Sequence, residues 1–287
     1  MRNGGINLHA RDILEQFEEI FYLLEGNNIS INKSNRFYQF YKEYSQLLIK
    51  DNIEEHFSEL LEGMRDFFEI KSIVSCKEIL ENSKQELKLL FGGSRLPSED
   101  ANSLARNLQY QLYLASRFSN SGMNINCVEP DFIFNYDSEI YSVAVKRITS
   151  RNKVKERIKE AEQQILKYDY DGFIAISIDR LLEYSNPFII TNNPDVLPSA
   201  TYELLTGIVK ETFDKDCFEG RSKKVKGLII TLGVPSFTPN DLSIGYGFNL
   251  QLFPLTEPND EREFERIGKI SERLSMRSEF NEDDNIS

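Results

Sequence analysis

The sequence is poor in the residues that build the commonest metal and nucleophile sites. Its 287 residues include two histidines and three cysteines. The cysteines, Cys76, Cys127 and Cys217, lie far apart without paired spacing, so we expect neither a disulfide framework nor a zinc site. His9 and His56 have no partner motif and are interpreted as structural. Histidine-rich metal sites and histidine-based triads are therefore disfavoured.

Long apolar runs are also missing. No stretch of 18 or more apolar residues occurs, which predicts the absence of a transmembrane helix and of membrane partners. The first residues, MRNGGINLHARD, lack the apolar core of a signal peptide, and we expect a cytoplasmic protein. Hydrophobic residues make up 40% and charged residues 28% of the chain, a composition typical of a globular protein with a sizeable core.

Basic residues are outnumbered, and they are unevenly distributed. The net charge of −12 argues against a protein that coats nucleic acid over its whole surface. The basic residues are concentrated in one segment, residues 146–159, called the basic strip below. Such a segment suits a site that binds phosphate at a single place. Residues 276–287 are acidic and polar, which predicts a disordered tail. The basic strip consists of Lys146, Arg147, Arg151, Lys153, Lys155, Arg157 and Lys159.

The spacing of apolar residues predicts an all-helical N-terminal module over residues 1–93. Gly26 and Gly92-Gly93 are natural helix stops, and no strand-like alternation is recognised between them. The expected helices cover residues 8–26, 35–49, 53–68 and 73–91.

Residues 94–275 are predicted to form an α/β (α+β) domain with a mixed central sheet flanked by helices. Ser98 is a candidate cap for its first helix, and the turn Tyr136-Asp137-Ser138 joins two strands as a hairpin. The apolar run Gly172–Ile178 is typical of a buried central strand. Residues 184–198 contain three prolines and are predicted to be irregular. The predicted strands are 124–128, 132–135, 139–147, 172–178, 227–232 and 245–253, and the predicted helices 101–118, 153–167, 200–213 and 261–274.

The segment Glu129–Lys146, EPDFIFNYDSEIYSVAVK, carries the most chemical information. Metal-dependent phosphodiester hydrolysis needs Mg²⁺ held by carboxylates and a backbone carbonyl, with open positions for water and phosphate. On a hairpin, an acid that begins one strand can face an acid and a lysine two residues apart on the next, because residues two apart share a face. Asp131 and Lys146 occupy two of these positions, and Ala144 occupies the third.

This arrangement resembles the PD-(D/E)xK, or restriction-endonuclease-like, nuclease superfamily. The resemblance covers residues 98 to 180 best, and it identifies residues 94–275 as a nuclease-like domain. It implies Asp131 as the first metal ligand, the carbonyl of Val145 as the backbone ligand and Lys146 as the catalytic lysine. The implied cofactor is Mg²⁺ or Mn²⁺, and the implied substrate is DNA, with RNA as a second option. Gln164 and Tyr168 form a Q-x-x-x-Y spacing similar to the recombination-exonuclease branch, where this motif lies beside the metal site and contacts DNA.

Two positions depart from the family pattern. Gln111 stands where the preceding helix often offers an acid, and Ala144 replaces the second acid, which lowers the expected affinity for Mg²⁺. Three explanations remain open: an engineered Glu-to-Ala change, a migrated acid supplied by Glu160, or a natural pseudo-nuclease that binds nucleic acid without cutting it. Glu160 lies four residues before Gln164 and shares its helix face, although a solvated charge is the simpler interpretation of Glu160 by itself.

The basic strip completes the hypothesis. Cations at a helix N-terminus oppose the helix dipole, so local stability does not explain them. We expect a Mg²⁺-dependent DNA nuclease, or a form disabled at Ala144, and by analogy alone a bacterial anti-phage or toxin-like effector. The alternative is an inactive nuclease-fold protein that binds nucleic acid or a protein partner, with the N-terminal helices as a surface for partners or self-association. The residues expected to contact phosphate are Arg147, Arg151, Lys153, Lys155 and Arg157.

Overall fold

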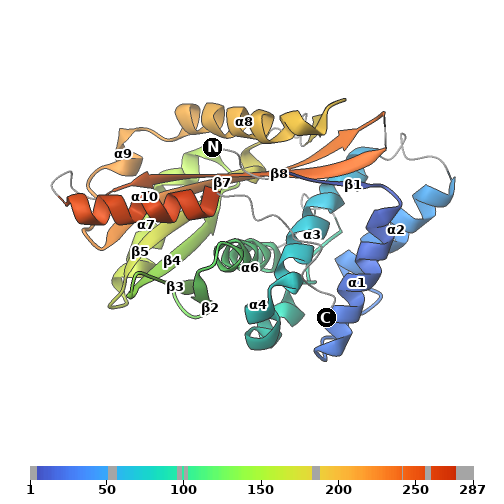
Figure 1. The fold of residues 1–287 in the computed structure, drawn as a ribbon, viewed down its shortest axis with the longest axis horizontal. Coiled ribbons are helices and arrows are strands. Elements are labelled where there is room, and N and C mark those ends of the chain that lie inside the picture. The colour runs from blue at the N-terminus through green and yellow to red at the C-terminus, as the bar shows by residue number, and fades with distance from the viewer. Residues whose placement is uncertain are drawn as a thin grey trace.

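The fold is mixed α/β, as predicted, with one twisted sheet between two layers of helices (Figure 1). It is seen in a computed structural model that describes residues 5–50, 57–95, 99, 103–182, 188–240, 242–255 and 260–275. His56, Ser98 and the predicted tail at 276–287 lie outside these residues. Within them, no helix combines the length and apolar character needed to cross a bilayer.

The sheet has the strand order β1-β8-β7-β5-β4-β3-β2, and β6 pairs with the far end of β7. Strands β3 and β4 form the predicted antiparallel hairpin, whereas β4, β5 and β7 run parallel to one another. The predicted central strand is confirmed, because β5 lies between β4 and β7. The strands are β1 Gly5–His9, β2 Asn124–Asn126, β3 Phe132–Tyr136, β4 Glu139–Arg147, β5 Asp171–Ser177, β6 Ile189–Ile190, β7 Val225–Thr238 and β8 Ser243–Pro254.

Helices cover the two faces of the sheet over separate apolar clusters. The helices α1 to α6 and α10 pack over one cluster, and α7, α8 and α9 pack over the other. Figure 1 shows α8 and α6 on opposite sides of the sheet. The helices are α1 Asp12–Gly26, α2 Arg36–Lys50, α3 Phe57–Ser75, α4 Lys77–Asn82, α5 Lys84–Leu89, α6 Leu104–Asn120, α7 Val154–Leu166, α8 Leu197–Thr212, α9 Lys215–Phe218 and α10 Glu261–Ser275.

Three predictions about local structure are wrong. The N-terminal region is not all-helical, because β1 adds to the sheet edge with Gly5 paired to Gly247 of β8. The helix expected over 73–91 is not continuous, because residues 73–75 end α3 and two short helices follow, α4 and α5, separated at Ser83. The segment expected to be irregular contains β6, and α8 begins inside it at Leu197.

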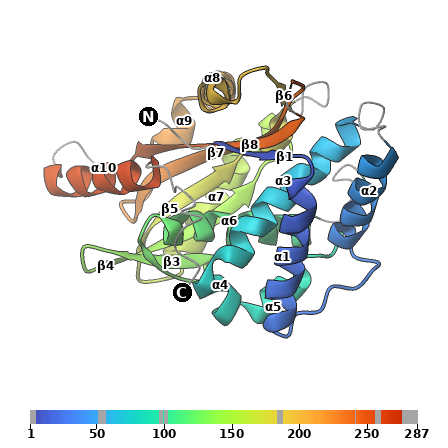
Figure 2. The same ribbon diagram turned by 45° about the vertical axis from the view of Figure 1, so that its right-hand side comes forward.

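The N-terminal helices share their core with the sheet. A single apolar cluster includes Phe17 of α1, Phe67 of α3, Phe118 of α6, Phe132 of β3 and Tyr246 of β8. Figure 2 shows α1 and α3 standing beside α6, with β1 leading directly into the sheet. A division of the chain at residue 93 remains a prediction, and the packing joins both sides of it in one core.

Candidate functional site

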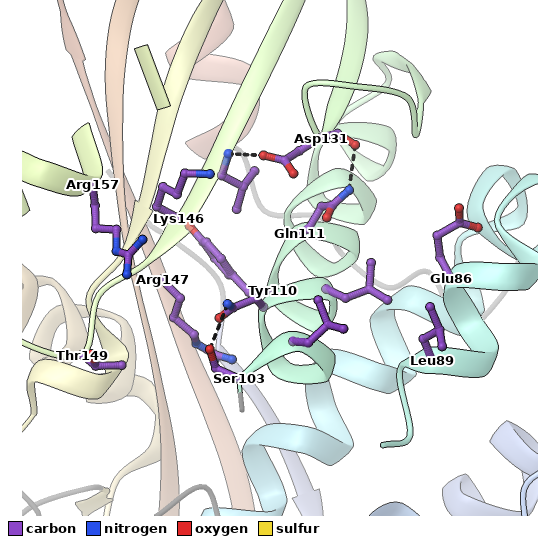
Figure 3. Close-up of a pocket in the computed structure, with 14 residues that line it drawn as sticks. Glu86, Leu89, Ser103, Tyr110, Gln111, Asp131, Lys146, Arg147, Thr149 and Arg157 are labelled. Atoms are coloured by element: carbon purple, nitrogen blue, oxygen red, sulfur yellow. Dashed lines mark hydrogen bonds between the residues drawn. The ribbon is translucent and has the colours of Figure 1, made fainter. Parts of the chain in front are cut away.

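A pocket of about 420 Å³ lies where the C-terminal end of β4 passes α6 (Figure 3). Asp131 and Lys146 line it together, as do Gln111 of α6 and Arg157 of α7. The hairpin explains this meeting, because Phe132 pairs with Val143 and so brings the residue before β3 beside the last residues of β4. In Figure 3 the Asp131 carboxylate and the Lys146 side chain point toward one another.

Asp131 is fixed at both its side chain and its backbone. Its Oδ2 accepts a 2.6 Å hydrogen bond from the backbone N–H of Val145. Its carbonyl oxygen accepts a 2.8 Å bond from Nε2 of Gln111, so the residue that replaces the expected acid holds the loop instead. Burial raises the pKa of Asp131 to about 6, although the Val145 bond and the Lys146 charge act to lower it.

One residue of the Q-x-x-x-Y motif, Gln164, contacts a residue of this site. The ammonium of Lys146 donates to Oε1 of Gln164, which ties β4 to α7. Desolvation raises the pKa of Tyr168, and the carboxylates of Glu129 and Asp131 raise it further. Tyr168 is half-buried and is not among the residues that line the pocket.

Ala144 does not face the pocket. Its side chain is fully buried in the apolar cluster that includes Ile158 and Ala161 of α7. Side chains alternate along β4, so Val143 and Val145 belong to the opposite cluster. The small side chain at 144 therefore lies beneath α7. A residue in a strand points its N–H and its C=O toward the same neighbouring strand. The carbonyl of Val145 therefore faces the side on which its N–H bonds to Asp131.

The donor set fits Mg²⁺ in kind but is short in number. Mg²⁺ is bound through one or two carboxylates and keeps several waters. Asp131 and the Val145 carbonyl supply oxygen donors, and Glu160 is held in an ion pair, with Nη1 of Arg157 2.6 Å from its Oε2. Among the residues whose positions are described, no group of three or more His, Cys, Asp or Glu side chains could hold a metal ion.

Arg147 has a different role from the one predicted. Its guanidinium is buried, with Nη2 2.7 Å from Oδ2 of Asp179 and 3.5 Å from Oε1 of Glu69. Its Nη1 donates a 2.9 Å bond to the carbonyl of Arg106. The side chain borders the pocket, but two carboxylates already balance its charge, so the expected phosphate contact stays a prediction that this buried pairing disfavours. Consecutive side chains on β4 point to opposite faces of the sheet. Lys146 points toward α7, so Arg147 points into the core on the other face.

Much of the basic strip is paired with acids from distant segments. Lys155 lies 2.7 Å from both Asp214 and Asp216, which flank the start of α9. Arg151 lies 3.0 Å from Glu211 of α8. These exposed pairs are weak, so phosphate can replace the acids. Lys153 and Lys159 are exposed, and neither has an ion pair among the described residues, so both are open to solvent and ligands.

A buried polar network behind the pocket was not predicted. Gln109 of α6 donates to Asp66 at 3.0 Å and to Glu69 at 2.5 Å, and Nη1 of Arg106 lies 2.7 Å from Asp66. Burial raises the pKa of Asp66, but Arg106 and Arg36 outweigh that effect and hold the pKa below its usual range. The only signal in the sequence is a set of polar residues on the apolar face of α6.

Comparison of the chain with protein-family models, with curated proteins and with solved structures found no significant match in any of the three. The functional interpretation therefore rests on the geometry of the pocket.

Proposed function

We propose that this chain is a Mg²⁺-dependent nuclease of the PD-(D/E)xK type in which Glu160, instead of residue 144, supplies the second carboxylate. The observation that carries the proposal is the meeting of Asp131 and Lys146 at one pocket. The helix that bears Glu160 is tied to the same point through the bond between Lys146 and Gln164. DNA is the proposed substrate.

The position of Ala144 favours a migrated acid over a lost one. Ala144 is fully buried beneath α7 and is not among the residues that line the pocket, so a longer side chain there would have to repack this cluster before it could reach a metal. Glu160 lies one turn before Gln164 on α7, and its partner Arg157 lines the pocket. Approach of a phosphate would offer Arg157 an alternative anion and release the Glu160 carboxylate.

Each residue then has a chemical role. Asp131, Glu160 and the Val145 carbonyl would hold Mg²⁺, which supplies Lewis-acid activation of the phosphate and of water. With a pKa of about 6, Asp131 is largely ionised at neutral pH and able to act as a ligand. Lys146 stabilises the negative charge that develops on the phosphate oxygens, and Gln164 orients the ammonium.

A cleavage assay with matched variants tests the proposal. Plasmid, linear and single-stranded DNA, and a single-stranded RNA, are incubated with the chain in Mg²⁺ or Mn²⁺. Asp131→Asn, Lys146→Ala and Glu160→Gln should each lower the rate by about 100-fold or more, in the range seen when transition-state stabilisation is removed. Glu156→Gln, an exposed change on the same helix, is the control and should keep the rate. Equal rates for Glu160→Gln and Glu156→Gln would show that Glu160 is not a ligand.

A second candidate function is binding of nucleic acid without cleavage. The observation that favours it is the pairing of Glu160 with Arg157, which leaves Asp131 as the one carboxylate beside Lys146 in the pocket lining. This candidate predicts salt-dependent DNA binding that weakens in Lys146→Ala and Lys153→Ala, with no cleavage in either metal. The same purified variants decide between the two.

A further inference from the structure

The pocket extends well beyond the charged pair, along one face of α6. Leu104, Asn107, Leu108 and Gln111 line it, and their spacing of three, four and seven residues places them on a single helix face. At 1.5 Å per residue this face is about 10 Å long. The Gln111 end holds Asp131, and the other end carries leucines together with the carboxylate of Glu86 beside Leu89 (Figure 3).

The leucine end is open to solvent. Leu104 of α6 is 66% exposed and Leu89 of α5 is 59% exposed, and both line the pocket. Figure 3 shows Leu89 across the pocket from Lys146. On the side of the pocket away from Leu89, Nδ2 of Asn107 donates to Oγ of Ser103 at 3.1 Å (Figure 3). Two exposed leucines beside an amide form a surface suited to a flat, largely apolar group with a polar edge.

We infer that the pocket takes one unpaired nucleotide of a DNA strand, with its phosphate at Lys146 and its base against Leu89 and Leu104. This inference rests on the proposed function and names its preferred substrate as single-stranded DNA or a strand end. A volume of about 420 Å³ suits a molecule the size of one nucleotide and is far too small for a base pair with its two backbones.

The energetics favour a strand that is already unpaired. To place a base from duplex DNA in such a pocket, the protein must unstack and unpair it at a cost of a few kcal/mol. A single strand needs no unpairing, and contact between a base and an apolar side chain tolerates any sequence. Lys146 and Arg157 at the charged end attract the backbone phosphate.

Fluorescence anisotropy in EDTA, where cleavage is suppressed, tests the inference with the full chain. The probes are a labelled single-stranded oligonucleotide, the same strand with one abasic position at its labelled end, and a duplex whose ends are closed by non-nucleotide linkers, so that it has neither a free terminus nor an unpaired base. The single strand should bind about 10-fold more tightly than the closed duplex at equal salt. Leu104→Ser and Leu89→Ser should each weaken binding of the single strand about 5- to 10-fold and leave binding of the duplex unchanged.

Leu204→Ser is the matched control, because Leu204 is 39% exposed on α8 and does not line the pocket. Equal affinity for the single strand and the closed duplex would overturn the inference, and so would equal losses in Leu104→Ser and Leu204→Ser. Cleavage of both substrates with no dependence on Leu104 would keep the nuclease and reject the unpaired nucleotide. If binding of the single strand depends on the leucines but no metal supports cleavage, the unpaired-nucleotide site is kept and the nuclease is rejected.

Discussion

The backbone N–H of Val145 donates a 2.6 Å hydrogen bond to the carboxylate of Asp131, fourteen residues earlier in the chain. This bond closes the open end of the β3–β4 hairpin, where strand pairing stops at Phe132 and Val143. It also fixes the acid beside Lys146, the next residue along β4. The relative position of the two motif residues is therefore set by the strand backbone.

Stability should depend on pH through Asp131. Its pKa of about 6 lies above the unfolded value of 3.8, so protonated Asp131 stabilises the fold at low pH, and this contribution is lost as pH rises through about 6. Asparagine does not titrate and can still accept the Val145 bond. The difference in melting temperature, Asp131→Asn minus wild type, should be larger at pH 8 than at pH 4. This change corresponds to at most about 3 kcal/mol in the free energy of unfolding. A difference that stays constant with pH would contradict the raised pKa.

Glutamate at position 144 should destabilise the fold. The side chain of Ala144 is fully buried in an apolar cluster against α7, and a carboxylate there loses its hydration. Lys146, two residues on and on the same face, already donates to Gln164 and would offset this loss only in part. We expect Ala144→Glu to lower the free energy of unfolding by about 3–5 kcal/mol. Ala144→Ser is the control and should lose much less. If Ala144→Glu unfolds in urea at the wild-type midpoint and gains Mg²⁺ affinity, an engineered loss of the acid becomes the better explanation.

Arg147 should contribute to stability and not to phosphate binding. Removing its charge leaves Glu69 and Asp179 buried without their cation, so Arg147→Met should cost about 3–5 kcal/mol in urea unfolding. The double variant Arg147→Met/Asp179→Asn should lose less free energy of unfolding than the two single variants added together. Removing either partner is costly mainly because it leaves the other charge buried and unpaired. Strict additivity would argue that the pair does not interact. Lys153→Ala, at an exposed position, should leave stability unchanged.

Mg²⁺ should stabilise the chain through the carboxylates of the pocket. A cation beside Asp131 lowers the pKa of that carboxyl, and a ligand that binds only the folded state raises its stability. At pH 7, millimolar Mg²⁺ or Mn²⁺ should raise the melting temperature of wild type but not of Asp131→Asn. The shift should be smaller in Glu160→Gln than in Glu156→Gln. An equal shift in all four proteins would show that the metal binds elsewhere.

The hairpin and the parallel strand after it were predictable because their signals are local. Alternating side chains, a turn at Asp137-Ser138 and a continuous apolar run each report the structure of the segment that contains them. The same holds for the spacing that brings Gln164 to Lys146, since α7 follows β4 directly.

The errors arise where the partner is remote in sequence. Ile6 and Leu8 are too short an alternation to indicate β1, and their pairing partners lie in β8. Asp66 and Glu69 look like ordinary exposed helix charges, because the arginines that pair with them come from other elements. The acids that neutralise Lys155 lie beyond α8, so the basic strip looked more available than it is.

The pairing of β1 with β8 also sets a constraint on when the protein can finish folding. Gly5 to His9 precede their partners in the order of synthesis, and they can pair only after residues 243–247 have been synthesised. Contacts of such high sequence separation slow folding. The apolar faces of α1 and α3 share a core with β8, so they stay incompletely covered throughout translation.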